Sequence, residues 1–435
     1  MQEYINLKYK PKDNEIIAKF HIEPEKGKTI PEVANHVAGE SSIDTWSEIR
    51  TLSPEIAKKL KPSVFYINKN VIKIAYSPEL FEKGSIAQLL SAVAGNILSM
   101  KNVKNLKLYD ITFPKTYIDA FKGPEFGIPG IRQLFKVKNR PFLGTIVKPK
   151  VGLNSKQHAH IAYQSWLGGL DLVKDDENLT DQAFNRFEDR LKETLKLRKK
   201  AEEETKQKKM YMINITAPDT EEMLARAKLV KKYGGEYAMI DIIPTGWTAL
   251  QTLRKENSKL KLVLHAHRCG HSGITRNFRH GISMLVIAKL CRLLGFDQLH
   301  TGTVIGKMDG SKYEVFGIDT EMEEQEISAI AHTLRMPKHA EEYDLLPQNW
   351  YNIKPLFPVA SGGLHPLMIP SLYKMFGKDI ILQFGGGIHA HPKGTYYGAK
   401  AASQALDAAM KKIPLKEYAK NHPELKDAIK KWGKE

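Results

Sequence analysis

Residues 168–177 form an apolar, strand-like run that ends abruptly in four charged residues. Side chains alternate between the faces of a strand, so Lys174 and Asp176 share one face, and Glu177 joins them only if the strand breaks there. Two carboxylates suit Mg²⁺, and a lysine whose pKa is lowered by burial can take up CO₂ as a carbamate that adds a third anionic oxygen. The pattern indicates a metal site, with a salt-bridge cluster as the alternative.

A second run, residues 144–150, ends in two lysines on either side of Pro149. Proline keeps the backbone extended, so both amines are presented from a stiff segment. In a closed cavity Lys148 could donate and accept protons, while Lys150 could hold a phosphate as a point charge. Surface lysines are the alternative, but the reactive interpretation is favoured because these lysines end the first strand and the carboxylates end the second.

Histidines end two further strand-like runs. His265 and His267 share one face of the segment before Arg268, which suits either a metal-ligand pair or a proton-transferring histidine beside a phosphate-binding arginine. A hydrogen-bonded core position is the alternative for His265. After His300, a short segment flanked by glycines ends at Lys307, a pattern typical of a mobile loop that carries one cation over a site, or of an ordinary exposed loop.

Glycines follow the last two strand-like runs, at 362–363 directly after Ser361 and at 385–387. Glycine lets backbone N–H groups approach an anion closely, and the loops after strands seven and eight of a (β/α)₈ barrel commonly bind phosphate. Either segment alone could be a tight turn, but together they predict a phosphate site. Lys148 and Lys150, after the first strand, would suit a second phosphate.

These residues need a scaffold that gathers strand ends. From residue 142 onward the chain repeats a short β-branched or aromatic run, a polar loop and an amphipathic stretch, the pattern of parallel β/α units. The eight runs are 142–147, 170–174, 210–216, 237–243, 262–267, 298–303, 356–360 and 380–384. They predict a C-terminal (β/α)₈ TIM barrel with catalytic groups at the carboxyl ends of its strands. An open doubly wound sheet is the competing fold, but its glycine-rich fingerprint is absent.

The pattern changes before residue 142. Strand-like runs at 16–22 and 65–75 and helical stretches at 29–38 and 84–98 predict a separate α+β domain of ferredoxin-like type. Segment 123–141 contains the glycines and prolines expected of a join. We therefore predict an N-terminal domain at 1–135 and a barrel domain at 136–435.

The composition narrows the classes of partner. The net charge of +17 allows a nucleic acid, an anionic membrane surface or an acidic small molecule. Much of the excess lies in mixed-sign stretches such as 186–209 without interleaved aromatics, so we expect neither a nucleic-acid nor a membrane partner. Cys269 and Cys291 show no metal-type pairing and fit a reducing interior, and the lack of a long apolar run predicts a cytoplasmic protein.

The motifs GTIVKPK, GGLDLVKDDEN, HAHR, HTGTVIGK, VASGG and LQFGGG run in this order through the chain. As an ordered set they resemble ribulose-1,5-bisphosphate carboxylase/oxygenase (rubisco) large subunits of the archaeal form III type. The resemblance implies a lyase that carboxylates D-ribulose 1,5-bisphosphate with CO₂ and water to two 3-phospho-D-glycerate, with competing oxygenation by O₂. It also implies a homodimer or ring of dimers with composite sites and no small subunit, serving AMP and nucleotide ribose salvage or carbon fixation.

The same resemblance implies a role for each matching residue. The Mg²⁺ ligands would be Lys174, carbamylated by an activating CO₂, Asp176 and Glu177. The catalytic residues would be Lys148 as general acid and base, His267 as proton acceptor, Lys307 on the loop, and carbamylated Lys174. Substrate would be bound by Lys150, Arg268, His300, Ser361, Gly362, Gly363, Gln383, Phe384, Gly385 and Gly386, and from the partner subunit by Glu40, Thr45, Trp46 and Asn96.

Two positions differ from plant-type members of the family. Ile146 stands where those have threonine, and Cys269 and Gly270 follow Arg268 where those have alanine and methionine.

The family also contains rubisco-like proteins that enolise or isomerise sulfur-containing sugar phosphates, and these usually lose some of the lysines. Here the relevant residues are all present: Lys148, Lys150, Lys307 and Glu40. We therefore expect a true carboxylase and keep the enolase-type activity as the alternative. A third hypothesis, a basic nucleic-acid-binding barrel, predicts strongly salt-dependent polyanion binding, but the charges form no continuous stripe.

Overall fold

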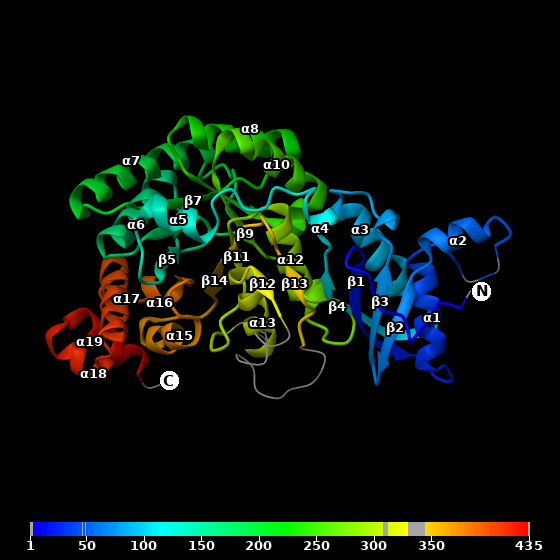
Figure 1. The fold of residues 1–435 in the computed structure, drawn as a ribbon. Coiled ribbons are helices and arrows are strands. Elements are labelled where there is room, and N and C mark those ends of the chain that lie inside the picture. The colour runs from blue at the N-terminus through cyan, green and yellow to red at the C-terminus, as the bar shows by residue number, and fades with distance from the viewer. Residues whose placement is uncertain (1–2, 46, 48, 308–311, 329–343, 434–435) are drawn as a thin grey trace. The chain divides into compact units, whose positions relative to one another are not determined.

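The computed structural model describes residues 3–45, 47, 49–307, 312–328 and 344–433 (Figure 1). The chain divides into two compact units. The first consists of Met1–Gly123, Gly270–Leu294 and Lys312–Ile353, and the second of Pro124–Cys269, Gly295–Ser311 and Lys354–Glu435. Within the described ranges, no helix is both long enough and apolar enough to span a bilayer.

A five-stranded sheet in the order β10-β4-β1-β3-β2 organises the first unit. Its strands are β1 (Ile16–Pro24), β2 (Ser63–Asn68), β3 (Val71–Tyr76), β4 (Val103–Thr112) and β10 (Gly281–Ile282). β1 is central and antiparallel to both β3 and β4. Ile16, Ala18, Phe20 and Ile22 alternate along β1 and are fully buried, which determines the face of the strand that joins the core.

Helices and a small hairpin complete the first unit. They are α1 (Ile30–Glu40), α2 (Pro54–Leu60), α3 (Ile86–Val93), α4 (Lys115–Ile118), α11 (Ser272–Thr275), α12 (Met284–Leu294) and α13 (Lys312–Glu323), the 3-10 turns η1 (Pro78–Leu80) and η2 (Asn96–Ser99), and the pair β12 (Glu326–Ile327) and β13 (Gln348–Asn349). Lys289 of α12 is fully buried, with its Nζ 2.6 Å from Asp110 Oδ1 and 3.0 Å from Glu321 Oε1. A buried three-residue ion cluster therefore links α12 to β4 and α13.

The structure corrects the predicted N-terminal elements at three places. Run 65–75 is a hairpin rather than one strand, because the chain turns at Lys69, whose φ is 47°. The helix expected to reach residue 98 ends at Val93. Just after this helix end, the backbone of Gly95 lies so close to the Ser91 carbonyl oxygen that a Cβ there would be only 2.1 Å from it, so this position needs glycine. The sequence pattern does not predict β4, because the buried residues of that strand include Lys107 and Asp110, which obscure its alternation.

The second unit contains a closed barrel in the order β11-β14-β15-β5-β6-β7-β8-β9. All eight neighbouring pairs are parallel. The strands are β5 (Phe142–Ile146), β6 (Leu172–Lys174), β7 (Met210–Asn214), β8 (Tyr237–Asp241), β9 (Val263–His267), β11 (Gln298–His300), β14 (Phe357–Ser361) and β15 (Ile381–Phe384). Each overlaps one of the eight predicted runs in order, so the predicted TIM barrel is confirmed.

Apolar side chains close the amino end of this barrel. Ile128, Ile131 and Phe135 of α5 (Gly127–Phe135) belong to one buried cluster with the first residues of seven strands, namely Phe142, Leu172, Met210, Tyr237, Val263, Phe357 and Ile381. Gly144 of β5 pairs with Leu172 of β6 and leaves room for the Leu172 side chain, since a Cβ at Gly144 would lie 2.0 Å from Leu172 Cδ1. With the amino end filled, polar groups are left to the carboxyl ends of the strands.

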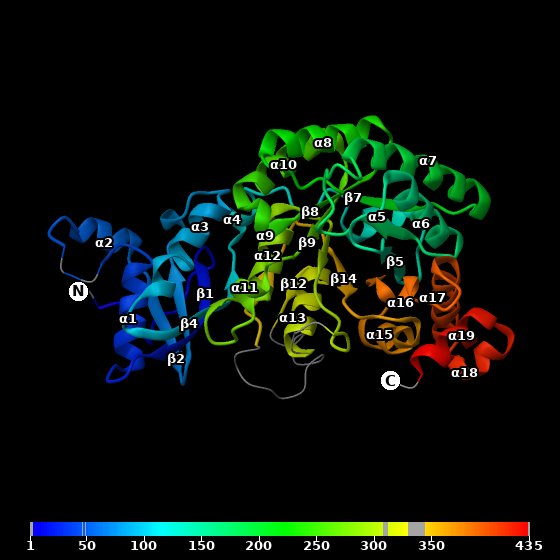
Figure 2. The same ribbon diagram turned by 180° about the vertical axis from the view of Figure 1, so that it is seen from behind.

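Helices surround the barrel strands, and Figure 2 shows α6, α7, α8 and α10 along one side of them. The longer helices are α6 (Ser155–Leu167), α7 (Phe187–Thr205), α8 (Thr220–Lys232), α10 (Trp247–Leu260), α15 (Ile369–Phe376), α17 (Thr395–Met410) and α19 (Pro423–Trp432). Shorter turns are α9 (Ile242–Thr245), α16 (Gly386–His389), α18 (Leu415–Tyr418), η4 (Pro366–Met368) and η5 (Ala419–Asn421). A capping box formed by Asn154 and Gln157 begins α6. This helix therefore starts soon after the segment that carries Lys148 and Lys150.

Candidate active site

A buried lysine lies at the carboxyl end of β6. The strand ends at Lys174, and the chain leaves the barrel wall before Asp176 and Glu177. Lys174 is fully buried, and this burial lowers the pKa of its amine, although the carboxylates of Glu177 and Asp241 favour the charged form. Its Nζ donates a 2.6 Å hydrogen bond to the Asp175 carbonyl oxygen. The neutral amine is the form that reacts with CO₂, and a lowered pKa makes this form easier to reach.

The carboxylates of Asp176 and Glu177, next to Lys174, each form an ion pair with a lysine that follows β5. Lys148 Nζ donates to Asp176 Oδ2 over 2.6 Å. Burial raises the pKa of Asp176, but the Lys148 ammonium and the hydrogen bonds from Asn178 together outweigh burial and hold the pKa below its ordinary range. Glu177 Oε1 lies 3.6 Å from Lys150 Nζ. Carboxylate oxygens that already attract cations, next to a buried amine that could carry a carbamate, fit a hard cation such as Mg²⁺.

Asp175 belongs to a separate, buried cluster on β6. Its Oδ2 accepts from Arg190 Nε at 3.0 Å and its Oδ1 from the Tyr211 hydroxyl at 2.7 Å. Burial raises the pKa of Asp175, but the Arg190 guanidinium, His158 and the Tyr211 hydroxyl together outweigh this effect and hold the pKa well below its ordinary range. Sequence reasoning missed this residue, although strict alternation after Lys174 places Asp175 on the opposite face. The cluster anchors the strand end that carries Lys174 and Asp176.

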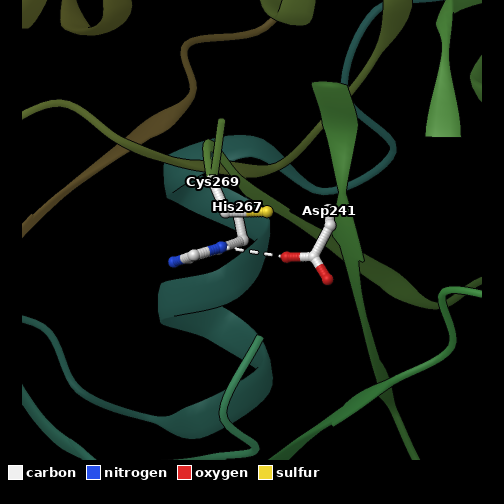
Figure 3. A group of neighbouring side chains, drawn as sticks. All are labelled: Asp241, His267 and Cys269. Atoms are coloured by element: carbon white, nitrogen blue, oxygen red, sulfur yellow. Dashed lines mark hydrogen bonds and ion pairs between the residues drawn. The ribbon is translucent and has the colours of Figure 1, made fainter. Parts of the chain in front are cut away.

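Asp241, at the end of β8, was also missed by sequence reasoning, although it lies inside the predicted run 237–243. Its Oδ1 accepts a 2.9 Å hydrogen bond from His267 Nδ1, and Cys269 lies beside both residues (Figure 3). His267 Nε2 lies 3.7 Å from Glu177 Oε2. Burial lowers the pKa of His267, whereas burial and the Asp241 carboxylate raise the pKa of Cys269 to about 12. A neutral imidazole that donates from Nδ1 has its lone pair at Nε2 and can accept a proton there.

His265, His300 and Ser361 form a hydrogen-bonded chain across three strands. His265 Nε2 lies 2.9 Å from His300 Nε2, and His300 Nδ1 lies 2.6 Å from Ser361 Oγ. Burial lowers the pKa of both histidines well below the ordinary value, so both are neutral. Because Gln298 Oε1, 2.9 Å from His265 Nδ1, can only accept, His265 donates from Nδ1 and accepts at Nε2. It follows that His300 accepts at Nδ1 from the Ser361 hydroxyl, so His265 determines the tautomer of His300.

The Lys307 segment lies against the glycines after β14. The Lys307 N–H donates to the Gly362 carbonyl oxygen at 3.0 Å, and the side chain of Lys307 is exposed. A Cβ at Gly363 would lie 2.7 Å from Lys307 Cγ, and one at Gly306 would lie 2.3 Å from the Gly362 oxygen. Glycine is therefore required at both positions for this approach. Residues 308–311, which follow Lys307, lie outside the described residues.

The second glycine segment follows β15. Gly385 lies close to Lys148, since a Cβ at Gly385 would lie 3.3 Å from Lys148 Cε, whereas one at Gly386 would meet no atom within 4 Å. Gln383 and Phe384 are both fully buried, with Gln383 Nε2 4.0 Å from the sulfur of Met212. The backbone at Gly385 and Gly386 therefore borders open space beside Lys148.

The remaining predicted residues fall in two groups. Arg268, which follows β9, donates from Nη1 to the Thr301 carbonyl oxygen at 3.3 Å in the second unit. Glu40, at the end of α1, Thr45 and Asn96 belong to the first unit, and Asn96 is exposed. Trp46 lies outside the described residues.

Comparisons with known proteins cover both units. The family described as "Ribulose bisphosphate carboxylase large chain, N-terminal domain" matches residues 3–117, and the corresponding "catalytic domain" matches residues 127–432. A "Ribulose bisphosphate carboxylase" of Methanosarcina mazei is 58% identical over 435 residues, covering 100% of this chain and 99% of the relative. The protein of the same name from Methanocaldococcus jannaschii is 46% identical, covering 99% and 100%.

Solved structures match over the same length. The dimeric archaeal rubisco of Hyperthermus butylicus superimposes with a TM-score of 0.91 at 43% identity and covers 99% of each chain. The octameric rubisco of Pyrococcus horikoshii, in complex with sulfate, superimposes with a TM-score of 0.88 at 45% identity, covering 99% of this chain and 96% of that one.

Proposed function

The chain belongs to the ribulose bisphosphate carboxylase large-chain family, and on this premise we propose that its site joins CO₂ to D-ribulose 1,5-bisphosphate and, with water, forms two molecules of 3-phospho-D-glycerate. O₂ is the competing substrate. The observation that carries the proposal is the meeting of a fully buried Lys174 with Asp176 and Glu177 at the carboxyl end of β6. The retention of Lys148 and Lys307 favours carboxylation over the enolase-type alternative.

Activation by CO₂ would take place at Lys174. Its carbamate, with Asp176 and Glu177, would hold Mg²⁺, and the lowered pKa of this buried amine supports carbamate formation. The bound ion supplies Lewis-acid polarisation of the substrate's carbonyl and hydroxyl oxygens. Asp176 would exchange its present partner, the Lys148 ammonium, for the metal, which leaves the Lys148 amine free to transfer protons.

Proton transfer would be divided between Lys148 and His267. Lys148, at the end of the first barrel strand, would act as general acid and base and deliver the final proton to the product carbanion. His267 would accept a proton at Nε2 during hydration and cleavage, because Asp241 holds the proton of the imidazole at Nδ1. Lys307 would stabilise the carboxylate that forms when CO₂ adds, and the loop carrying it would exclude water.

The two substrate phosphates would bind at opposite sides of the barrel mouth. Backbone N–H groups and cations would hold them, with His300 and Ser361 contacting the sugar hydroxyls. The proposed phosphate and substrate contacts are Lys150, Arg268, Gly362, Gly363, Gly385 and Gly386. Gln383 and Phe384, both buried, would position the glycines that follow β15.

The assembly would be a homodimer, or a ring of dimers, without a small subunit. In this proposal the N-terminal domain, residues 1–135, completes the site of the partner's barrel domain, residues 136–435. It would contribute Glu40, paired with Lys307, together with Thr45, Trp46 and Asn96. Support comes from two similar solved structures, one described as dimeric and one as octameric.

Incorporation of labelled bicarbonate into acid-stable product tests the proposal. Enzyme is preincubated with or without CO₂ and Mg²⁺ and then given ribulose 1,5-bisphosphate. Activity that requires both, with 3-phosphoglycerate as product, is expected. Exchange of the substrate's C3 proton without carbon fixation would instead favour the enolase-type reaction.

A further inference from the structure

Asp241, His267 and Cys269 form a group of metal-ligand side chains of a different chemical type from the magnesium site. One ligand atom of each, a carboxylate oxygen, an imidazole nitrogen and a thiol sulfur, lies within 4.8 Å of the other two (Figure 3). Asp241 and His267 end adjacent barrel strands, and Cys269 follows two residues after His267. We propose that these three side chains bind a thiophilic divalent cation such as Zn²⁺.

The donor set determines which kind of ion this site would take. Thiolate and imidazole are the ligands that zinc prefers, with three protein ligands and an open position for water in many sites, whereas Mg²⁺ prefers oxygen. His267 Nδ1 and Asp241 Oδ1 are 2.9 Å apart, a spacing compatible with two bonds of about 2.0–2.2 Å to one ion. A thiolate and a carboxylate would together neutralise its two positive charges.

An ion bound here would displace two protons. One is the His267 Nδ1 proton, which is donated to the Asp241 carboxylate, and the other belongs to the Cys269 thiol, whose sulfur lies within 4.8 Å of a ligand atom of each of the other two residues. On binding, the thiol proton is released to solvent, and the imidazole proton leaves Nδ1 while Nε2 takes one up from solvent. Nε2 then faces Glu177 Oε2, 3.7 Å away, as a donor. One proton is therefore released for each ion bound.

This exchange would remove the lone pair at Nε2, so the bound ion should block proton acceptance by His267 and inhibit turnover. The inhibition rests on the proposed function of His267, whereas ion binding itself does not. A thiophilic ion would thus act on a carboxylase whose own activating ion is a hard cation.

Thiolate coordination can be observed directly with Co²⁺ as the probe, in the presence of saturating Mg²⁺ and bicarbonate. The full-length chain has only two cysteines, and the second, Cys291, is fully buried in α12, so Cys291→Ala is the matched control. We expect a thiolate-to-cobalt absorption band that saturates at one ion per chain in the wild type and in Cys291→Ala. The band should be absent in Cys269→Ala and in Cys269→Ser, which keeps a hydroxyl near Asp241. No band in the wild type, or one that persists without Cys269, would overturn the site.

Inhibition by Zn²⁺ provides the second readout, with each variant compared with its own activity without the ion. Loss of a direct ligand should exceed the roughly 10–100-fold effect of losing an outer partner, so Cys269→Ser should need more than about tenfold higher Zn²⁺ for half-inhibition. Equal sensitivity of wild type and Cys269→Ser would overturn the proposal. A cobalt band without any loss of turnover would support the ion site and contradict the role of His267.

Discussion

Asp241 and His267 face each other as the last residues of β8 and β9, and a 2.9 Å hydrogen bond joins Oδ1 of the aspartate to Nδ1 of the histidine. The carboxylate can only accept, so the imidazole keeps its proton at Nδ1. Burial lowers the pKa of His267, which keeps the ring neutral. The pairing of two adjacent strand ends therefore leaves the lone pair of the imidazole at Nε2.

Replacing Asp241 with asparagine should separate the late steps from enolisation. An amide can donate as well as accept, so it no longer fixes the tautomer of His267. We expect carboxylation to fall by about 10²–10⁴-fold, the usual size of a general-base contribution, while exchange of the substrate's C3 proton persists. Both rates are measured on one preparation. A parallel loss of C3 exchange would place Asp241 in an earlier step, through its nearness to Lys174.

Lys307→Ala should abolish carboxylation and spare enolisation. The exposed amine is assigned only to the carboxylate that forms when CO₂ adds, so C3 proton exchange should remain while carbon fixation falls by about a thousandfold. Arg268→Ala is the comparison, because loss of a phosphate contact should mainly raise the KM for ribulose bisphosphate. If both activities of Lys307→Ala fell equally, the assignment of this lysine would be wrong.

His389→Gln should make the fold less sensitive to acid. Burial lowers the pKa of His389 from 6.5 to about 4, and its Nε2 lies 2.9 Å from the Ile146 carbonyl oxygen. Between these values the unfolded state binds the extra proton, so the free energy of unfolding decreases as the pH falls from 6.5 toward 4. The variant should lack this part of the decrease, which amounts to roughly 3 kcal/mol at pH 4. Denaturant unfolding at several pH values measures the difference, and parallel curves for both proteins would refute it.

Lys289→Met should strongly destabilise the first unit. It leaves Asp110 and Glu321 buried without their shared cation, and removing one member of a buried ion cluster costs about 3–5 kcal/mol. Trp350, whose Nε1 donates to Glu321 at 3.1 Å, is a fluorescent reporter next to the cluster. Lys28→Met removes an exposed pair and is the control, with little or no expected loss of stability. Equal effects of the two substitutions would contradict the prediction.

Much of the barrel is predictable from the sequence because each strand carries its own signal. A short apolar run that ends in charged residues or glycines indicates a buried strand and its carboxyl end, and all eight runs are confirmed. The same reasoning fails for β4, whose buried positions include Lys107 and Asp110. A polar residue that is buried with a partner looks like a surface residue until that partner is known.

The sequence by itself determined which residues lie at or just beyond the strand ends, including Lys148, Lys174 and His267, because alternation and breaks are local properties of the chain. Only the tertiary structure decided their partners. Closure of the barrel places β9 beside β11, which joins His265 to His300. It also places Asp241 against His267 and Cys269. Hydrogen bonds between strands depend on which strands are neighbours, and long-range packing of the whole barrel sets that order.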